Sequence, residues 1–478
     1  MSTKPGKLSL SVKLAYGAGE FGPAMAGSVL IFNLLYFLTN VAGIRADLAA
    51  NIYMIGKIWD AVNDPMVGLL SDKTRSKWGR RMPWLIWGAL PFGVFFLAQW
   101  VVPQFSAEPA RNLWPLFWYY VVVSILANTF YTVVTLPYGA MTAELTEDYD
   151  ERISLNSFRF AFSIGGSILG LVIAQVAFSL MEDPAQKYLV MGAMVTVLAL
   201  ASLAWCVIGT WKPAMDYEKK RTEAPPARAL SVGQQFRLVW QNKPFIYVCA
   251  IYLFSWLGVQ LTATVLPYYV VNVMGLGMSS FSLIALVVQG VALVMLPVWG
   301  ALARRVGKTQ VYFYGMIIWI LAQGGLYFLD ATQLEWIWPL ATMAGFGVSV
   351  AYLIPWSLMP DVIDYDELNT GERREGLYYG FMVLLQKFGL ALGIFLVGKG
   401  LAAAGFIETR AGMTPPVQPD SALTAIRISI GPLPTVALVI GMVLAWFYPI
   451  TRKKSAEILE KLHERRRIAE EERGAAPL

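Results

Sequence analysis

Long apolar runs separated by shorter polar stretches extend along almost the whole chain. A helix needs about 20 mostly apolar residues to cross a hydrocarbon core about 30 Å thick. Runs of this length recur, whereas segments of strictly alternating polarity, which a membrane β-barrel would show, do not. The pattern therefore predicts an all-α polytopic membrane protein with twelve transmembrane helices, at 14–41, 49–70, 83–103, 114–141, 156–180, 187–211, 245–274, 278–302, 310–329, 335–358, 376–404 and 422–449.

Basic side chains are concentrated in alternate connections between these segments, within 73–81, 212–243 and 304–308. Lys and Arg accumulate in loops on the cytoplasmic side of a membrane. An even number of spans places both termini on the same side. We therefore expect a multi-pass protein of the inner (cytoplasmic) cell membrane, with both termini and the central connection in the cytoplasm.

The chain divides into two similar halves. The charged connection 212–244 separates the first six segments from the last six, and the loop 68–81 has a counterpart at 300–308. Paired repeats of this kind are typical of transporters with a binding site near the bilayer midplane. We expect a monomer surrounded by membrane lipids, built from an N-terminal six-helix bundle at 1–211, a cytoplasmic linker at 212–244, a C-terminal six-helix bundle at 245–449 and a cytoplasmic tail at 450–478.

Composition agrees with a membrane location and narrows the chemistry. Of the 478 residues, 56% are hydrophobic and 15% charged, whereas a soluble chain has about 25% charged residues. The net charge of +6 reflects the basic loops, so a nucleic-acid partner is not expected. The single histidine, His463, lies in the tail, and Cys206 and Cys249 lie in apolar stretches. No histidine-based catalytic site is available inside the spans, so we expect neither an enzyme nor a cofactor.

The second segment contains the clearest candidate site. Asp60, Asn63 and Asp64 are spaced i, i+3 and i+4, so their oxygens share one face of a helix. A carboxylate at membrane depth is costly unless it is paired, protonated or bound to an ion. Such a cluster suits a hard cation such as sodium, and a carboxyl pair can equally carry a proton. Alternatively, Lys57 or a basic residue of another helix neutralises the carboxylates permanently.

Several motifs resemble those of one transporter family. They are Lys57-Ile-Trp-Asp-Ala-Val-Asn-Asp-Pro65, the loop 71–84, Tyr16-Gly-Ala-Gly-Glu-Phe-Gly22 and Asp361-Val-Ile-Asp-Tyr-Asp-Glu367. Together they resemble the glycoside-pentoside-hexuronide:cation symporters, the branch of the major facilitator superfamily that includes melibiose permease. The resemblance implies the major facilitator superfamily fold and cation-coupled transport of a saccharide. It also implies a sodium or proton site at Asp60, Asn63, Asp64 and Thr132.

The resemblance further implies where substrate binds. Lys387 matches a basic residue near the cation and sugar sites, and Arg159 matches an arginine associated with substrate binding. Arg159 lies near a predicted helix end, so it could instead extend to the membrane surface. The acids with which galactoside carriers hold sugar hydroxyls are replaced here by Ala24 and Thr135. Glu20, one turn before Ala24, either substitutes for the first acid or forms a structural ion pair.

Aromatic and amide side chains extend the candidate substrate site. Trp256 and Gln260 share a helix face at i and i+4, and Tyr268 and Trp356 could stack on or hydrogen-bond a sugar. Core packing or anchoring at the membrane interface is the alternative for each aromatic residue. The complete predicted substrate set is Glu20, Arg159, Trp256, Gln260, Tyr268, Trp356 and Lys387.

Charged residues in the predicted cytoplasmic loops are candidates for gating. Ion pairs that form in one orientation of the carrier and break in the other would support alternating access. The alternative is that these charges only set the topology. The candidate pairs are Asp72 with Arg75, and Asp361 or Asp364 with Arg152 or Arg374.

The sequence thus favours cation-coupled symport of a glycoside, oligosaccharide or uronide by alternating access. The loss of acids at Ala24 and Thr135 favours a larger or anionic saccharide over a galactoside. A carrier of the same family for an amphipathic compound such as a lysolipid is the first alternative. A membrane-embedded transferase is the least favoured. Sodium and proton coupling both stay open.

Overall fold

The chain is helical throughout its described part. The computed structural model describes residues 8–106, 108–146, 149–220, 240–371, 375–409 and 416–474, and these contain no β-strand. The first part forms α1 (Leu10–Asn40), α2 (Ala46–Lys73), α3 (Met82–Ala98), α4 (Leu113–Leu145), α5 (Tyr149–Leu180) and α6 (Pro184–Lys220). The second part forms α8 (Lys243–Tyr268), α9 (Met278–Val306), α10 (Lys308–Phe328), α11 (Ile337–Thr370), α12 (Glu375–Ala403), α13 (Asp420–Ile430), α14 (Pro432–Trp446) and α15 (Arg452–Gly474). Short helical turns precede α4 and α11 at Pro109–Asn112 and Leu334–Trp336, and a π-helical turn at Tyr269–Val273 follows α8.

The helices have the length and polarity of membrane spans. Within the described residues, ten candidate spans are long and apolar enough to cross a membrane. α3 is apolar but only 17 residues long, and α2 is interrupted by the charges of Lys57, Asp60 and Asp64. The prediction of an all-α polytopic membrane protein is therefore confirmed.

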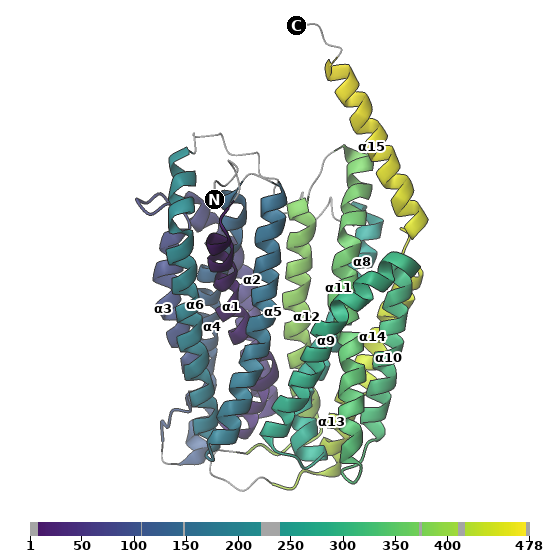
Figure 1. The fold of residues 1–478 in the computed structure, drawn as a ribbon. Coiled ribbons are helices and arrows are strands. Elements are labelled where there is room, and N and C mark those ends of the chain that lie inside the picture. The colour runs from purple at the N-terminus through teal and green to yellow at the C-terminus, as the bar shows by residue number, and fades with distance from the viewer. Residues whose placement is uncertain are drawn as a thin grey trace.

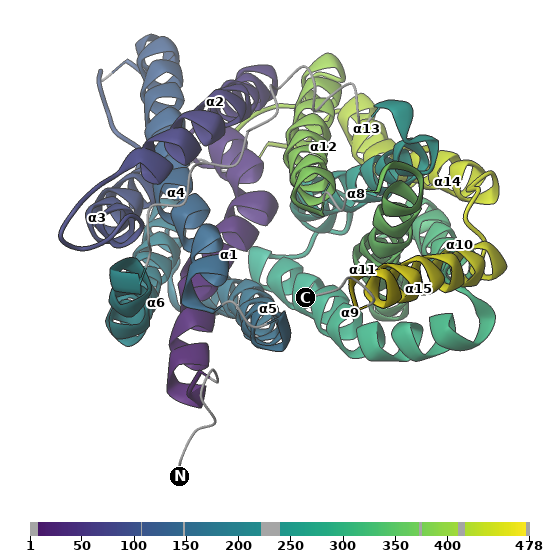
Figure 2. The same ribbon diagram turned by 90° about the horizontal axis from the view of Figure 1, so that it is seen from above.

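The helices gather in two groups. Seen from above, α1 to α6 lie on one side of the molecule and α8 to α14 on the other (Figure 2). The start of α1 lies at the same end of the molecule as α15 (Figure 1). Across the junction, α2 packs on α12, α5 on α9 and α1 on α8.

The two groups are held together at the end opposite α15. There, the hydroxyls of Thr39 on α1 and Tyr268 on α8 lie 2.7 Å apart. A Cβ added to Gly398 of α12 would lie 2.5 Å from the Cβ of Ala50 on α2, so these helices are in close contact. The amide of Ala46 donates to Glu408 at 2.9 Å. These contacts close the junction at that end.

Three local features differ from the predicted segments. The final span is broken between α13 and α14 at Gly431, because Pro432 cannot donate a backbone hydrogen bond and disfavours helical geometry in the residue before it. α3 ends at Ala98 and not at 103, where the chain turns and Tyr120 donates to the carbonyl of Val101. The tail is helical, but Ile458 on it is buried, so one face packs against the protein.

Candidate cation and substrate site

The predicted oxygen cluster on α2 is assembled as its spacing indicates. Asp60 and Asn63 are buried, and Asp64 on the same face keeps 25% of its side chain exposed. Thr132 of α4 completes the cluster, with its hydroxyl oxygen 3.0 Å from Asp60 Oδ1 and 2.9 Å from Asp64 Oδ1. A hydroxyl has one proton, so it can donate to only one of these carboxylates at a time.

Two lysines balance the charge of this cluster. The Nζ of Lys57 lies 3.4 Å from Asp60 and donates to Asn128 of α4 at 2.8 Å. The Nζ of Lys387, from α12, lies 3.1 Å from Asp60 and forms a closer ion pair with Asp64. Two carboxylates therefore face two ammonium groups, one on their own helix and one from the other half of the molecule. The sequence offered Lys57 or a basic residue of another helix as the group that neutralises the carboxylates, and the structure contains both.

Lys387 reaches the cluster because α12 lies between α8 and α2. A Cβ added to Gly389 would lie 2.9 Å from the Cδ1 of Trp256, so the glycine face of α12 packs closely on α8. Lys387 lies two residues earlier, roughly on the opposite side of the helix. Its ammonium group thus joins α12 to the carboxylates of α2.

The donor set suits a small monovalent cation. It combines two carboxylates, the amide of Asn63 and the hydroxyl of Thr132, which are hard oxygen ligands. The amide nitrogen of Asn63 is buried and has no hydrogen-bond partner in the part of the chain that the structure describes. In the described part of the chain, no group of three or more His, Cys, Asp or Glu side chains is arranged to hold a metal.

Glu20 and Arg159 form an ion pair in the first half. Arg159 Nε on α5 donates to Glu20 Oε2 on α1 at 2.7 Å, and the guanidinium lies 5.5 Å from the ring centre of Tyr138. Arg159 thus points to a partner within the protein. Glu20 forms the structural ion pair that was one of its two alternatives in the sequence analysis. A substrate acid or hydroxyl would compete with Glu20 for this guanidinium.

The second half supplies an aromatic cluster. Trp256 of α8 contacts Tyr352 of α11 with ring centres 5.5 Å apart, and Trp356 stacks on Tyr379 of α12 at 6.0 Å. Trp256 Nε1 and Gln260 Oε1 are buried and have no hydrogen-bond partner among the described residues. One face of α8 therefore presents an unsatisfied donor and an unsatisfied acceptor, beside rings of the kind that stack on sugars.

Tyr268 lies apart from this cluster. Its ring is buried against Tyr36 and Phe406, and its hydroxyl contacts Thr39. It joins α1 to α8 near the closed end of the junction. This position explains its burial without a substrate.

The gating candidates are placed only in part. Asp361 pairs with Lys308 of α10 at 2.6 Å and also accepts from Ser455 at 2.9 Å. Arg75 is exposed, and Asp364 lies on α11. The side chains of Asp72 and Arg152, and the whole of Arg374, lie outside the described residues. Gating by these residues stays a prediction.

Sequence reasoning missed two residues that touch the site and the partner of one gating candidate. Asn128, which accepts from Lys57, lies one turn before Thr132 on α4. Tyr352 lies one turn before Trp356 on α11. In both cases an i, i+4 search from a chosen residue would have found the partner. Lys308, the partner of Asp361, was visible only as a basic loop residue.

The fold and this charged cluster define a polytopic membrane transporter. A family model described as MFS/sugar transport protein matches residues 15–452. The chain therefore belongs to this family, and the resemblance to the glycoside-pentoside-hexuronide:cation symporters is confirmed. Its members are transporters and not enzymes.

Named relatives extend over nearly the whole chain. A symporter of Synechocystis sp. is 46% identical and covers 96% of this chain and 97% of its own. A Salmonella typhimurium protein named for sulfoquinovose import is 27% identical over 96% of this chain and 94% of its own. A zebrafish (Danio rerio) protein named as a sodium-dependent lysophosphatidylcholine symporter is 25% identical over 94% of this chain and 87% of its own.

Solved structures show the same fold. The bacterial homologue of the human lysosomal transporter Spinster superposes with a TM-score of 0.65 at 12% identity, covering 94% of this chain and 97% of its own. At this identity the likeness concerns the fold alone. The fold is that of major facilitator transporters.

Proposed function

We propose that this protein is a symporter that uses a sodium or proton gradient to drive uptake of a glycoside, oligosaccharide or uronide. It works by alternating access between two six-helix bundles, 1–211 and 245–449, linked by 212–244 and followed by the tail 450–478. The observation that carries the proposal is the carboxylate pair of α2 held by an ammonium group of α12. The protein acts as a monomer in the inner membrane, with both termini cytoplasmic.

Coupling follows from competition for the carboxylates. An incoming cation and the ammonium of Lys387 compete for Asp60 and Asp64, so binding of the cation releases Lys387. Release removes a tie between α2 and α12, and it also frees a positive group that can hold a substrate hydroxyl or acid. Because linkage is reciprocal, substrate bound to Lys387 strengthens cation binding in turn.

The choice between sodium and a proton depends on the same ligands. Thr132 and Asn63 contribute neutral oxygens that a proton does not need and sodium does. This donor set supports sodium as the coupling ion. Titrating uptake against sodium at several fixed pH values distinguishes the two, because a proton-coupled carrier follows pH without needing sodium.

The substrate is most compatible with an anionic or large saccharide. Arg159 and Lys387 supply positive groups, whereas Ala24 and Thr135 stand where galactoside carriers have acids. Trp356 and Tyr379 offer stacked rings on the other side of the junction. The relative named for sulfoquinovose import, a sulfonated sugar, supports an acidic saccharide.

A lysolipid is the second candidate. The observation that favours it is the zebrafish relative named for sodium-dependent lysophosphatidylcholine transport. A lysolipid presents an acyl chain as well as a polar headgroup, so it would use the same cation cluster with an apolar path for its tail. Competition between a lysolipid and an acidic saccharide for uptake separates the two candidates.

The experiment is a ligand screen followed by transport. Purified protein is heated with and without sodium in the presence of mono- and oligosaccharides, uronides, sulfoquinovose and a lysolipid, because a ligand raises apparent stability by mass action. Hits are then assayed for accumulation in proteoliposomes with wild-type protein and Asp64→Asn. Asp47→Asn is the matched control, since Asp47 is also on α2 but pairs with Arg45 outside the cluster. Sodium- and proton-independent accumulation would contradict the proposal.

A further inference from the structure

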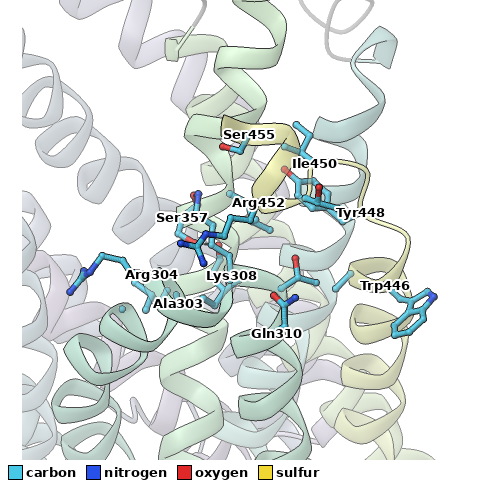
Figure 3. A pocket seen from close by; sticks show the side chains of 18 residues that line it. Ala303, Arg304, Lys308, Gln310, Ser357, Trp446, Tyr448, Ile450, Arg452 and Ser455 are labelled. Carbon is cyan, nitrogen blue, oxygen red and sulfur yellow. Dashed lines mark hydrogen bonds between the residues drawn. The ribbon is translucent and has the colours of Figure 1, made fainter. Parts of the chain in front are cut away.

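A pocket lies far from the cation cluster, where α15 joins the body of the protein. It has a volume of about 520 Å³ and is enclosed by the end of α9, the start of α10, α11, the end of α14 and the start of α15 (Figure 3). Neither the cation site nor the aromatic cluster includes any of its lining residues. Its chemistry therefore calls for a separate explanation.

Two helix N-termini meet at this pocket. α10 begins at Lys308 after Gly307, whose φ of +109° favours glycine, and no described side chain caps it. Lys308, Thr309 and Gln310 of its first turn line the pocket. α15 begins at Arg452, which lines the pocket too. Free amide groups at helix N-termini and the helix dipole both attract an anion.

The side chains add positive charge. Lys308 is held by Asp361 at 2.6 Å and by the carbonyl of Ser357 at 2.8 Å. Arg452 donates to the carbonyl of Arg305 at 2.8 Å. Neither Arg452 nor Arg304 forms an ion pair within the described part of the chain. The lining therefore contains three basic side chains, of which Lys308 is paired with Asp361 and Arg304 extends to one side of the other two (Figure 3), so the lining carries an excess of positive charge.

One buried polar group in the pocket lacks a partner. The side chain of Tyr448 lines the pocket (Figure 3) and is only 6% exposed, and its hydroxyl has no hydrogen-bond partner among the described residues. A buried hydroxyl without a partner is costly. An anionic oxygen in the pocket would accept its proton. This observation, independent of the helix termini, indicates a ligand with acceptor oxygens.

The surroundings indicate that the ligand is a lipid. Trp446 is 75% exposed and points outward from the pocket (Figure 3), and tryptophan is enriched at membrane interfaces. A row of exposed apolar side chains on α14, spaced along one helix face, runs from Trp446 into the span: Val443, Ile440, Val439 and Val436. A phosphate in the pocket would therefore lie beside a surface suited to acyl chains.

We propose that this pocket binds the phosphate of an anionic phospholipid. The headgroup lies among the first turn of α10, Arg304, Arg452 and the Tyr448 hydroxyl, and the acyl chains follow α14. The bound lipid fixes the start of α15 against α10 and α11. Clusters of basic residues on the cytoplasmic side of membrane proteins recognise such lipids, and the proposed topology puts this pocket on that side.

The test compares lipid binding by full-length variants. Wild-type protein, the double variant Arg304→Gln/Arg452→Gln, and Tyr448→Phe are titrated with phosphatidylglycerol in detergent, and bound lipid is counted by native mass spectrometry. Lys453→Gln is the matched control, because Lys453 is exposed on the same turn of α15 and does not line the pocket. We expect at least tenfold weaker binding for the double variant, several-fold weaker binding for Tyr448→Phe, and little change for the control.

Other arms separate a lipid from free phosphate and from general charge effects. Phosphatidylcholine, which has a phosphate but no net charge, and inorganic phosphate should each bind at least tenfold more weakly than phosphatidylglycerol. Equal binding of inorganic phosphate would overturn the lipid assignment. Equal loss in Lys453→Gln, or no loss in either pocket variant, would overturn the site. Tyr448→Phe keeps the ring and its packing, so it still tests the site if the double variant does not fold.

Discussion

Replacing Asp60 by Asn removes one charge from the cation cluster while keeping the size of the side chain. The Asp60 side chain is 1% exposed, so water screens its charge poorly. Its carboxylate lies 3.1 Å from Lys387 Nζ and 3.0 Å from the hydroxyl of Thr132. The substitution leaves Asp64 as the only carboxylate between two ammonium groups.

The expected loss can be worked from this geometry. A monovalent cation about 4 Å from a carboxylate gains about 4 kcal/mol at an effective dielectric constant of about 20. Asp60→Asn forfeits that gain, but Lys387 also loses one of its two carboxylate partners and competes less strongly. We therefore expect a net loss of about 2–3 kcal/mol, which corresponds to about 30- to 150-fold weaker cation binding.

The assay is the cation concentration at half-maximal substrate uptake in proteoliposomes, measured at constant pH for sodium and across pH for protons. Thermal unfolding without ligand checks that Asp60→Asn is folded. Asp47→Asn, a carboxylate of the same helix that pairs with Arg45, should keep the wild-type value. If Asp60→Asn folds and its half-maximal concentration is unchanged for both cations, the assignment of the cation cluster is wrong.

Four further substitutions test other parts of the account. Lys387→Met removes the group that competes with the cation, so cation binding should tighten about tenfold, and substrate affinity should no longer rise with cation concentration. Isothermal titration with each ligand measures both effects. If substrate affinity still rises with cation concentration, the role assigned to Lys387 is wrong. Glu20→Gln should tighten binding of an acidic saccharide because Arg159 loses its partner, whereas Arg159→Gln should weaken this binding at least tenfold. If equilibrium binding gives the same affinity for both variants and the wild-type protein, the ion pair is purely structural. Gly398→Val should push α12 away from Ala50 and lower the stability of this contact by about 1–3 kcal/mol. Hydrogen exchange in the first turns of α2 should then be faster than in the wild-type protein. Unchanged exchange would contradict the close contact between α12 and α2.

Local spacing predicted the part of the site that lies on one helix. Asp60, Asn63 and Asp64 share a face because helical geometry alone places i, i+3 and i+4 together. Thr132 and Lys387 were found through resemblance to a family, since contacts across 72 and 323 residues leave no periodic signal. Lys57, by contrast, was visible from local spacing, one turn from Asp60.

The fold shows a similar division. Apolar runs located the helices, because a hydrocarbon core demands continuous apolar length. They did not reveal the break at Gly431, although the following Pro432 is a readable signal, nor the turn after Ala98, which depends on packing against α4. The pairing of Asp361 with Lys308 depends on how α10 and α11 approach each other, which sequence spacing does not encode.

The most direct test of the central claim is uphill transport by purified protein in proteoliposomes. An acidic saccharide identified in the thermal screen is supplied at equal concentration on both sides, and an inward sodium or proton gradient is imposed. The account predicts accumulation above the outside concentration with wild-type protein, and only equilibration with Asp64→Asn. Equal accumulation by the two proteins, or accumulation that needs neither gradient, would contradict it.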